Sequence, residues 1–345
     1  MSVLDLPSPK LEEWRWADMP ALQTAAEARP HASGIDPKSL FLDIEGPRLC
    51  FIDGLFEPAH SLPGKVRVEQ VAVTTVHPLG ELAEGEGWAV TLGREEALTG
   101  IQIVHLGSGG ENHVPARIVM EEDAVASVVE TFAGSGWANR LTQIDLARGA
   151  RLMRSVRLMQ AEGFVSIFLG VGGAGSRVDG ALTLTGKGAF AEMGGALLTR
   201  DTQKQECAVV VRHEALDGTS RQLWRAVAAD QSTASLAARV EVARGAQKTD
   251  GEQSLRGLLL QRTATVNLKP ELEIFADDVK CAHGATVGEL DKRALFYLES
   301  RGIPEARATA LLTRAFVADA LGRIGDEAVR EAFEADADAW LEAAL

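Results

Sequence analysis

The sequence is poor in aromatic residues, in cysteine and in positive charge, and each shortage excludes a class of protein. Aromatic residues make up 5% of the 345 residues, so alanine, leucine and valine must fill most of the core. The formal net charge of −14 argues against a general nucleic-acid binder, which would carry a basic patch. The three cysteines, Cys50, Cys207 and Cys281, are widely spaced. They do not suggest a disulfide framework and favour a reducing, cytoplasmic setting.

The sequence also lacks a long hydrophobic run and the common catalytic motifs. The apolar run from Phe164 to Val171 is interrupted by Ser166 and Gly170, and it is too short to span a bilayer. The first residues contain neither a basic region nor an apolar core, so no secretory signal is expected. No Ser-His-Asp or Walker-type arrangement is visible. We therefore expect neither a membrane protein nor an enzyme of these types.

The pattern of apolar residues divides the chain into an N-terminal cap (1–95), a β region (96–287) and a helical region (288–345). In the cap, a helix is predicted over 12–28, and the Asp-Gly pair at 53–54 predicts a hairpin. The β region contains short apolar or alternating runs separated by Gly, Asp, Asn and Ser, which is typical of strands and turns. Its runs are 101–106, 116–120, 126–132, 164–169, 181–184, 208–211, 236–242 and 264–268. No strict repeat period is visible, so a sandwich, a barrel and a solenoid all stay open on this evidence.

The last segment shows apolar residues at helical spacing. They include Leu290, Ala294, Leu298, Leu312 and Phe316. A glycine at 302 and a proline at 304 predict the end of one helix and the start of the next. These helices are expected to cap the end of the β region, and they could also form a docking surface for another protein.

The segment 269–286, KPELEIFADDVKCAHGAT, is the most informative in the chain. It brings together two carboxylates, a thiol and an imidazole, from Asp277, Asp278, Cys281 and His283. If the segment is one continuous strand, Asp277, Cys281 and His283 share a face, because side chains on a strand alternate with period 2. Thiolate, neutral imidazole and carboxylate are the usual ligands of iron or zinc. The spacing alone leaves open a metal half-site or a partly exposed strand end without a ligand role.

Three other features have simpler explanations. The run 170–175 matches G-x-G-x-x-G, but an alternating strand-like stretch comes after it where a dinucleotide site would need a helix, so we interpret the glycines as a turn. Asp277 and Asp278 could be the catalytic carboxylate pair of a carbohydrate-cleaving enzyme. They are adjacent, however, so on a strand they would point to opposite faces and could not flank one glycosidic bond. His213 is a candidate ligand, although a single histidine is more often a structural, hydrogen-bonded one.

The segment 269–286 closely resembles the signature of the SufB/SufD family of iron–sulfur cluster assembly proteins, in its SufD-like form. Two further blocks, RGAQKTD at 244–250 and LFYLESRGI at 295–303, are similar to the loop upstream of that signature and to the start of the family's helical region. The resemblance runs from about 180 to 316. It implies a mainly β protein, with a right-handed parallel β-helix core, a small N-terminal α/β cap and a C-terminal α-helical region.

The resemblance also implies a function, that of a non-catalytic scaffold subunit of a SufBCD-type complex. Such a subunit would pair with a SufB-like subunit through the β-helices and would dock a SufC-like ABC-type ATPase; isolated, it could pair with itself as a homodimer. No nucleic acid or membrane is expected among its partners. The isolated chain would bind no cofactor stably, and iron or an iron–sulfur cluster would be bound transiently in the complex. The alternatives are a SufB-like core subunit and a β-helix carbohydrate-active enzyme.

Carried over to this sequence, the resemblance implies His283 and Cys281 as candidate iron or cluster ligands, with Asp277 and Asp278 as weaker ones. The residues expected to contact the ATPase lie in the first part of the helical region. They are Leu295, Phe296, Leu298, Leu312 and Phe316.

Overall fold

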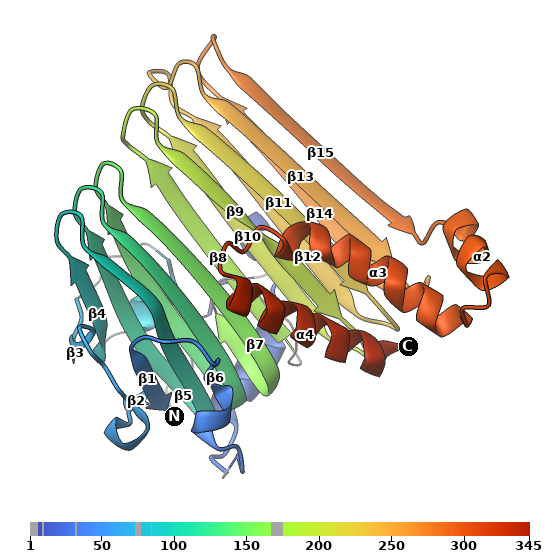
Figure 1. Cartoon of the computed structure of the whole chain (residues 1–345), viewed down its shortest axis with the longest axis horizontal. Coiled ribbons are helices and arrows are strands. Elements are labelled where there is room, and N and C mark those ends of the chain that lie inside the picture. Colours follow the sequence, from blue (N-terminus) through green and yellow to red (C-terminus); the bar gives the residue numbers. More distant parts are fainter. Residues whose placement is uncertain (1–5, 9, 32, 73–76, 84, 167–174) are drawn as a thin grey trace. The chain divides into compact units, whose positions relative to one another are not determined.

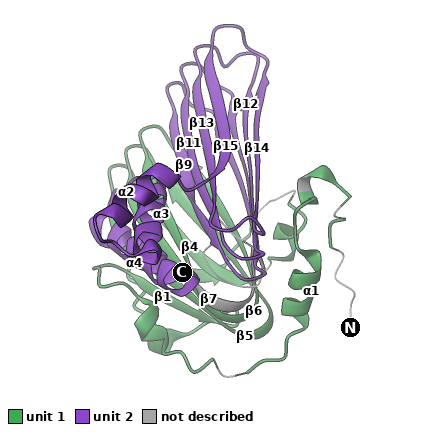
Figure 2. Cartoon of the chain, turned by 90° about the vertical axis from the view of Figure 1, so that its right-hand side faces the viewer, with its two compact units in different colours: residues 1–168, 172–177 green, residues 169–171, 178–345 purple. Residues whose placement is uncertain are grey.

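A computed structural model describes residues 6–8, 10–31, 33–72, 77–83, 85–166 and 175–345 of the chain. Strands account for 48% of the residues and helices for 21%, which confirms the prediction of a mainly β protein. The chain forms two compact units, which are coloured separately in Figure 2. Among the described residues, the first unit ends at Arg177 and the second begins at Val178. This boundary lies inside the predicted β region.

The first unit opens with short helices and a hairpin. Its elements in this part are η1 (Glu12–Trp14), α1 (Met19–Glu27), η2 (Pro37–Leu40), β1 (Arg48–Ile52), β2 (Leu55–Phe56), η3 (Pro58–His60), β3 (Arg67–Gln70) and η4 (Gly80–Leu82). The predicted hairpin is confirmed, because β1 and β2 pair antiparallel, and Asp53 and Gly54 adopt φ angles of 50° and 81° at the turn. The predicted helix 12–28 is shorter than expected. A proline at 20 is tolerated only in a first turn, so α1 starts at Met19, with the Asp18 carboxylate accepting from the N–H of Ala21.

The rest of the first unit is built from long parallel strands. They are β4 (Glu86–Leu92), β5 (Ala97–Met120), β6 (Val125–Leu146) and β7 (Arg151–Ser166). β5 pairs in parallel with β4 and β6, and β6 pairs in parallel with β7. The runs predicted as two strands, 101–106 and 116–120, are parts of the single strand β5, which is irregular between them near Ser108. Several of their apolar residues, Ile101 and Ile118 among them, lie in one buried cluster.

The second unit is a parallel β-solenoid. Its strands are β8 (Gly175–Leu184, which contains the unit boundary), β9 (Phe190–Thr199), β10 (Lys204–His213), β11 (Thr219–Ala228), β12 (Thr233–Val242), β13 (Asp250–Leu259), β14 (Thr265–Ile274) and β15 (Lys280–Glu289). β8, β10, β12 and β14 are neighbours in one sheet, and β9, β11, β13 and β15 in the other. The chain therefore changes sheet after each strand, and the strands run side by side in Figure 1. The predicted parallel β-helix core is confirmed, and its right-handed sense stays a prediction.

The strand β8 also bears on the glycine-rich run. Residues 170–174 of the run lie outside the described residues. β8 starts at Gly175, where a dinucleotide-binding site would require a helix. The strand at the C-terminal end of the run therefore argues against a dinucleotide-binding site, and the predicted turn itself lies outside the described residues.

Inside the solenoid, side chains alternate between the interior and the outer surface. In β12, for example, Leu236, Ala238 and Val240 are buried, whereas Ala237 and Arg239 between them are partly exposed. The last coil, made of β14 and β15, is different. β14 is mostly half-buried, and in β15 every residue except Cys281 is exposed. Within the described residues, β15 pairs only with β13, so the solenoid ends at a strand whose second edge carries no partner.

Three helices come after the last strand: α2 (Lys292–Ser300), α3 (Glu305–Leu321) and α4 (Glu327–Ala344). The predicted boundary is confirmed, since Gly302 adopts a φ angle of 82° and Pro304 is the N-cap of α3. α3 and α4 pack against the outer face of the sheet that contains β9, β11 and β13 (Figure 1), where Val317 and Trp340 join Val227 and Leu258 in one cluster. No helix among the described residues is both long and apolar enough to cross a membrane.

Candidate functional site

The terminal strand β15 carries the Cys281-x-His283 pair. In register, Cys281 lies beside Gly251 of β13, and His283 lies beside Gln253. Gly251 and Gln253 are buried and face the interior, so Cys281 and His283 share the interior face at the open end of the solenoid. Cys281 is half-buried and packs against an apolar cluster that includes Val240, whereas His283 is exposed. The predicted sharing of one face by the thiol and the imidazole is confirmed.

The two carboxylates are placed differently from the prediction. β14 ends at Ile274 and β15 begins at Lys280, so Asp277 and Asp278 lie in a bend and not on a strand. The expectation of one continuous strand through 277–283 is wrong, because the chain must turn a corner there to pass from one sheet to the other. The N–H of Asp278 donates to the side-chain oxygen of Gln247 at 2.9 Å, which helps to hold the corner. The alternation rule therefore does not place Asp277 on the face of Cys281 and His283.

Burial and nearby charge act on the Cys281 thiol. Burial raises the pKa of Cys281 above its ordinary value of 9.0, the backbone N–H of Gly251 opposes the increase by donating to the sulfur, and the negative charge of Asp250 adds to the increase. The thiol is therefore protonated at neutral pH. Any metal that it binds must displace the proton, because the thiolate is the ligand.

Gly251, which has no side chain, lies between Cys281 and a buried serine–histidine pair. A β-carbon placed on Gly251 would lie 3.4 Å from the Cys281 sulfur and 3.6 Å from the Ser220 hydroxyl oxygen. Ser220 and His213 form a hydrogen bond of 2.9 Å between the hydroxyl and the imidazole Nε2. His213 is 1% exposed, and burial lowers its pKa, which keeps the imidazole neutral. This describes a structural, hydrogen-bonded histidine, so His213 is not brought to the surface where Cys281 and His283 lie.

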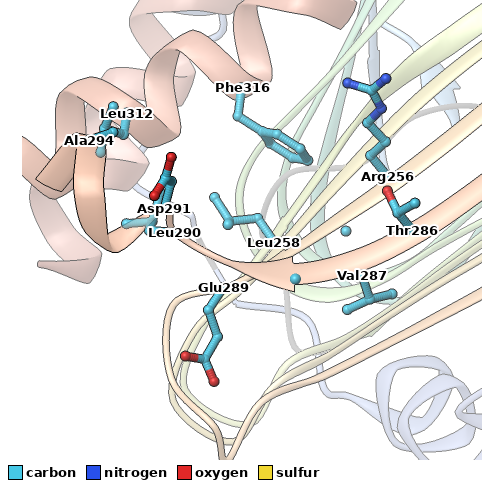
Figure 3. Close-up of a pocket in the computed structure, with 12 residues that line it drawn as sticks. Arg256, Leu258, Thr286, Val287, Glu289, Leu290, Asp291, Ala294, Leu312 and Phe316 are labelled. Atoms are coloured by element: carbon cyan, nitrogen blue, oxygen red, sulfur yellow. The ribbon is translucent and has the colours of Figure 1, made fainter.

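A groove of about 340 Å³ lies between the outer side of the last strands and helices α2 and α3 (Figure 3). Its apolar lining includes Leu258, Val287, Leu290, Ala294, Leu312 and Phe316. Arg256 and Asp291 add charged groups to the lining, and Phe316 points toward Leu258 in Figure 3. Two of the predicted docking residues, Leu312 and Phe316, thus meet in one groove. The other three lie on α2, where Leu295 and Leu298 are half-buried and Phe296 is 70% exposed.

Comparison with known proteins points to one family. Residues 153–316 match the SufBD core domain of the SUF system for FeS cluster assembly. The chain is 27% identical over 374 residues to the iron–sulfur cluster assembly protein SufD of Escherichia coli (strain K12), an alignment that covers 94% of this chain and 87% of that protein. The chain is thus similar to the SufB/SufD family, whose core domain it matches over residues 153–316.

Other SufB/SufD relatives agree over shorter stretches. An iron–sulfur cluster assembly SufBD family protein of Synechocystis is 32% identical over 219 residues, which cover 62% of this chain and 43% of that protein. The SufD protein of Bacillus subtilis is 29% identical over 148 residues, which cover 43% of this chain and 34% of that protein. Within the family the chain is most like SufD. The family core, 153–316, begins in β7 and ends in α3, so it contains both β15 and the groove.

Two buried side chains beneath His283 were not predicted from the sequence. Gln253 of β13 and Gln222 of β11 are each 2% exposed and face the interior in successive coils. The segment DGEQSLRGLL shows no clear signal, because Leu255 is the only large apolar side chain among its buried interior positions and the strand itself was not predicted. In the described part of the chain, no three His, Cys, Asp or Glu side chains are grouped closely enough to hold a metal ion.

Proposed function

We propose that this chain is a non-catalytic, SufD-like scaffold subunit of a SufBCD-type complex, and that iron or a nascent iron–sulfur cluster is its cargo. One observation carries the proposal: Cys281 and His283 lie together on the interior face of a terminal strand that is exposed. A thiol and an imidazole are suitable ligands for iron, but two ligands do not complete a tetrahedral site. The remaining ligands come from a second polypeptide.

The exposed edge of β15 supports a SufB-like subunit as that second polypeptide. A strand with an unpaired edge presents a row of N–H and C=O groups, and a strand from another chain can pair with them. Pairing of this kind would place the partner's side chains beside Cys281 and His283. Asp277 and Asp278, in the bend directly before β15, are weaker candidates that could hold iron before sulfur arrives.

Helices α2 and α3 are the proposed docking surface for a SufC-like ABC-type ATPase. Phe296 and Tyr297 are 70% and 57% exposed on α2, and the apolar groove between the last strands and helices α2 and α3 adds a second apolar surface. The sequence contains no phosphate-binding loop, so the ATPase must supply the energy. ATP-driven motion could then open and close a site whose ligands are divided between two chains, which would couple assembly to release.

The ligand role of His283 is tested in the reconstituted complex of the full chain with its SufB-like and SufC-like subunits. His283→Ala should leave the complex intact and abolish cluster formation, measured as protein-bound iron and acid-labile sulfide. Cys281→Ala tests the thiol in the same assay. His31→Ala is the matched control, because that imidazole is also exposed but lies in the other unit. Undiminished cluster formation in His283→Ala would refute the ligand role.

The docking surface is tested by a separate pair of variants. Full burial of one phenylalanine contributes about 1.5–3 kcal/mol, so Phe296→Ala should weaken binding of the ATPase at least about tenfold. Phe190→Ala is the control, since this side chain is similarly exposed, at 63%, but lies on β9. Titration calorimetry with the purified ATPase measures the affinity of both variants for it. Equal affinities for the two variants would place the contact elsewhere.

A further inference from the structure

A column of polar side chains lies beneath His283 inside the solenoid. His283 is in register with Gln253 of the preceding coil, and the position below Gln253 is Gln222. Both glutamines are 2% exposed. The Gln222 amide nitrogen donates to the carbonyl oxygen of Arg239 at 3.1 Å. Neither the amide nitrogen nor the amide oxygen of Gln253 has a hydrogen-bond partner in the part of the chain that the structure describes.

An unpartnered amide at this depth is unfavourable for folding. Leaving a buried polar group without a hydrogen bond costs about 1–3 kcal/mol, and an apolar side chain of similar size would avoid that cost. The next interior position on the same strand shows the usual solution, because Leu255 is fully buried there. Gln253 therefore has free hydrogen-bonding capacity at the interior position that is adjacent to His283.

We propose that Gln253 is the positioning residue of His283: the two side chains form no hydrogen bond in the arrangement described here, and a rotamer change brings the free amide oxygen to accept one from an N–H of the imidazole. Residues in register on neighbouring parallel strands are about 4.8 Å apart and point to the same face, so a glutamine side chain can reach the ring. The other ring nitrogen then keeps its lone pair for the cargo at the open end. A histidine that binds a metal almost always donates its second N–H to such an acceptor. This assignment rests on the proposed function at one point only, namely that the free ring nitrogen of His283 is a ligand of the cargo.

The two candidate ligands are supported in different ways. The position beneath Cys281 is Gly251, which has no side chain, so only its backbone N–H can support the sulfur from below. The imidazole has a side-chain acceptor beneath it instead. A neutral amide orients the imidazole without adding a charge, which is important in a buried position because a carboxylate there would have to be desolvated.

The assignment can be tested on the full chain alone, without iron. The protein is labelled with ¹⁵N-histidine, and the imidazole shifts of His283 report which ring nitrogen carries the proton; His283→Ala identifies the signals. We expect a single tautomer in the unaltered chain. Gln253→Met, which keeps the length of the side chain but removes the amide, should produce a mixture of the two tautomers.

Gln222→Met is the matched control, since it removes an equally buried amide one coil further from His283. It should leave the His283 signals unchanged. If Gln253→Met does not fold, Gln253→Leu provides the same comparison. The proposal is overturned if the tautomer is the same with and without the amide at 253, or if Gln222→Met changes it equally.

A second measurement separates this inference from the proposed function. In the reconstituted complex, loss of such a supporting contact should lower cluster formation about tenfold in Gln253→Met and not in Gln222→Met. If Gln253 fixes the tautomer but His283→Ala still assembles clusters normally, the positioning contact stands and the ligand role of His283 fails. If His283→Ala abolishes assembly while Gln253→Met changes neither the tautomer nor the yield, the ligand role stands and the positioning contact fails.

Discussion

The ion pair between Asp319 and Arg225 should hold α3 onto the solenoid. Arg225 projects from the outer face of β11, is 2% exposed, and donates from Nη1 to the carbonyl oxygens of Trp224 and Ser254 at 2.8 and 3.2 Å. Its Nε lies 3.1 Å from a carboxylate oxygen of Asp319 on α3. Arg225 forms no other ion pair within the described residues, so this carboxylate is its counter-charge.

Asp319→Ala would leave the buried guanidinium without that counter-charge. Removing one partner of a fully buried pair typically costs 3–5 kcal/mol, or about 4 kcal/mol in the middle of that range. The Asp319 carboxylate is 52% exposed, so solvent screening reduces the loss to roughly 2 kcal/mol. Since 1.4 kcal/mol corresponds to a factor of ten, local opening of α3 should become roughly 30 times more frequent.

Hydrogen exchange followed by mass spectrometry on the full chain measures this opening directly, peptide by peptide. The control is Asp338→Ala, which breaks the pair between Arg314 of α3 and Asp338 of α4, whose side chains are 3.1 Å apart and 54% and 36% exposed, so that neither charge is buried. An exposed pair contributes about 0.2–1 kcal/mol, so exchange in α3 should increase only a few-fold. Equal exchange in the two variants would show that the buried arginine does not anchor the helix. The result also bears on the proposed ATPase contact, since Phe316 of the groove lies on the same helix.

Two further predictions concern packing and pH. Gly257→Ala should destabilise the solenoid by about 1–3 kcal/mol, because its β-carbon would lie 2.6 Å from a methyl group of Val266, whereas Gly251→Ala makes only contacts of 3.4 Å or more and should cost little. Equal thermal midpoints for the two alanine variants would contradict this. Stability should also fall below about pH 6.5, because burial and two nearby arginines hold the pKa of His105 well below its ordinary value of 6.5. Below that pH, His105 binds a proton in the unfolded chain but not in the folded one. This difference lowers the free energy of unfolding by up to about 1.4 kcal/mol per pH unit. Urea unfolding at about pH 7.5 and about pH 5.5 should therefore show a smaller pH dependence in His105→Gln, and an unchanged dependence would count against it.

The sequence predicted one sheet of the second unit much better than the other. The runs 181–184, 208–211, 236–242 and 264–268 all correspond to strands of the sheet formed by β8, β10, β12 and β14. Strands β9, β11 and β13 of the other sheet were not predicted. β13 shows the reason: its interior positions include Gly251 and Gln253, and its outer positions include the exposed Glu252 and Arg256. The contrast between apolar and polar positions that identifies a strand is therefore missing.

The candidate site was predictable only as far as local geometry reaches. Alternation along a strand places Cys281 and His283 on one face, and that part is confirmed. The corner at Asp277 was not foreseen, because an apolar run gives no sign of where a coil turns. The stacking of His283 on Gln253 depends on register between coils, and the separation of stacked residues varies. It is 29 positions for Arg212 and Glu241 but 32 for Arg239 and Glu271. Without a constant period, the sequence cannot show which residue lies beneath which.

The composition of β15 gives a reason why the proposed ligands Cys281 and His283 lie on a strand at the edge of its sheet. Proteins that must stay apart protect an exposed edge strand with proline, a bulge or charged side chains. In β15 the only Lys, Arg, Asp and Glu are the terminal residues Lys280 and Glu289, and the eight residues between them include no proline and several small side chains. Such a strand is suited to pairing along its whole length. Because the thiol and the imidazole lie on the same strand, the pairing that covers the edge would also complete the metal site that we propose, so a subunit with a mismatched edge should fail in assembly and in cluster formation together.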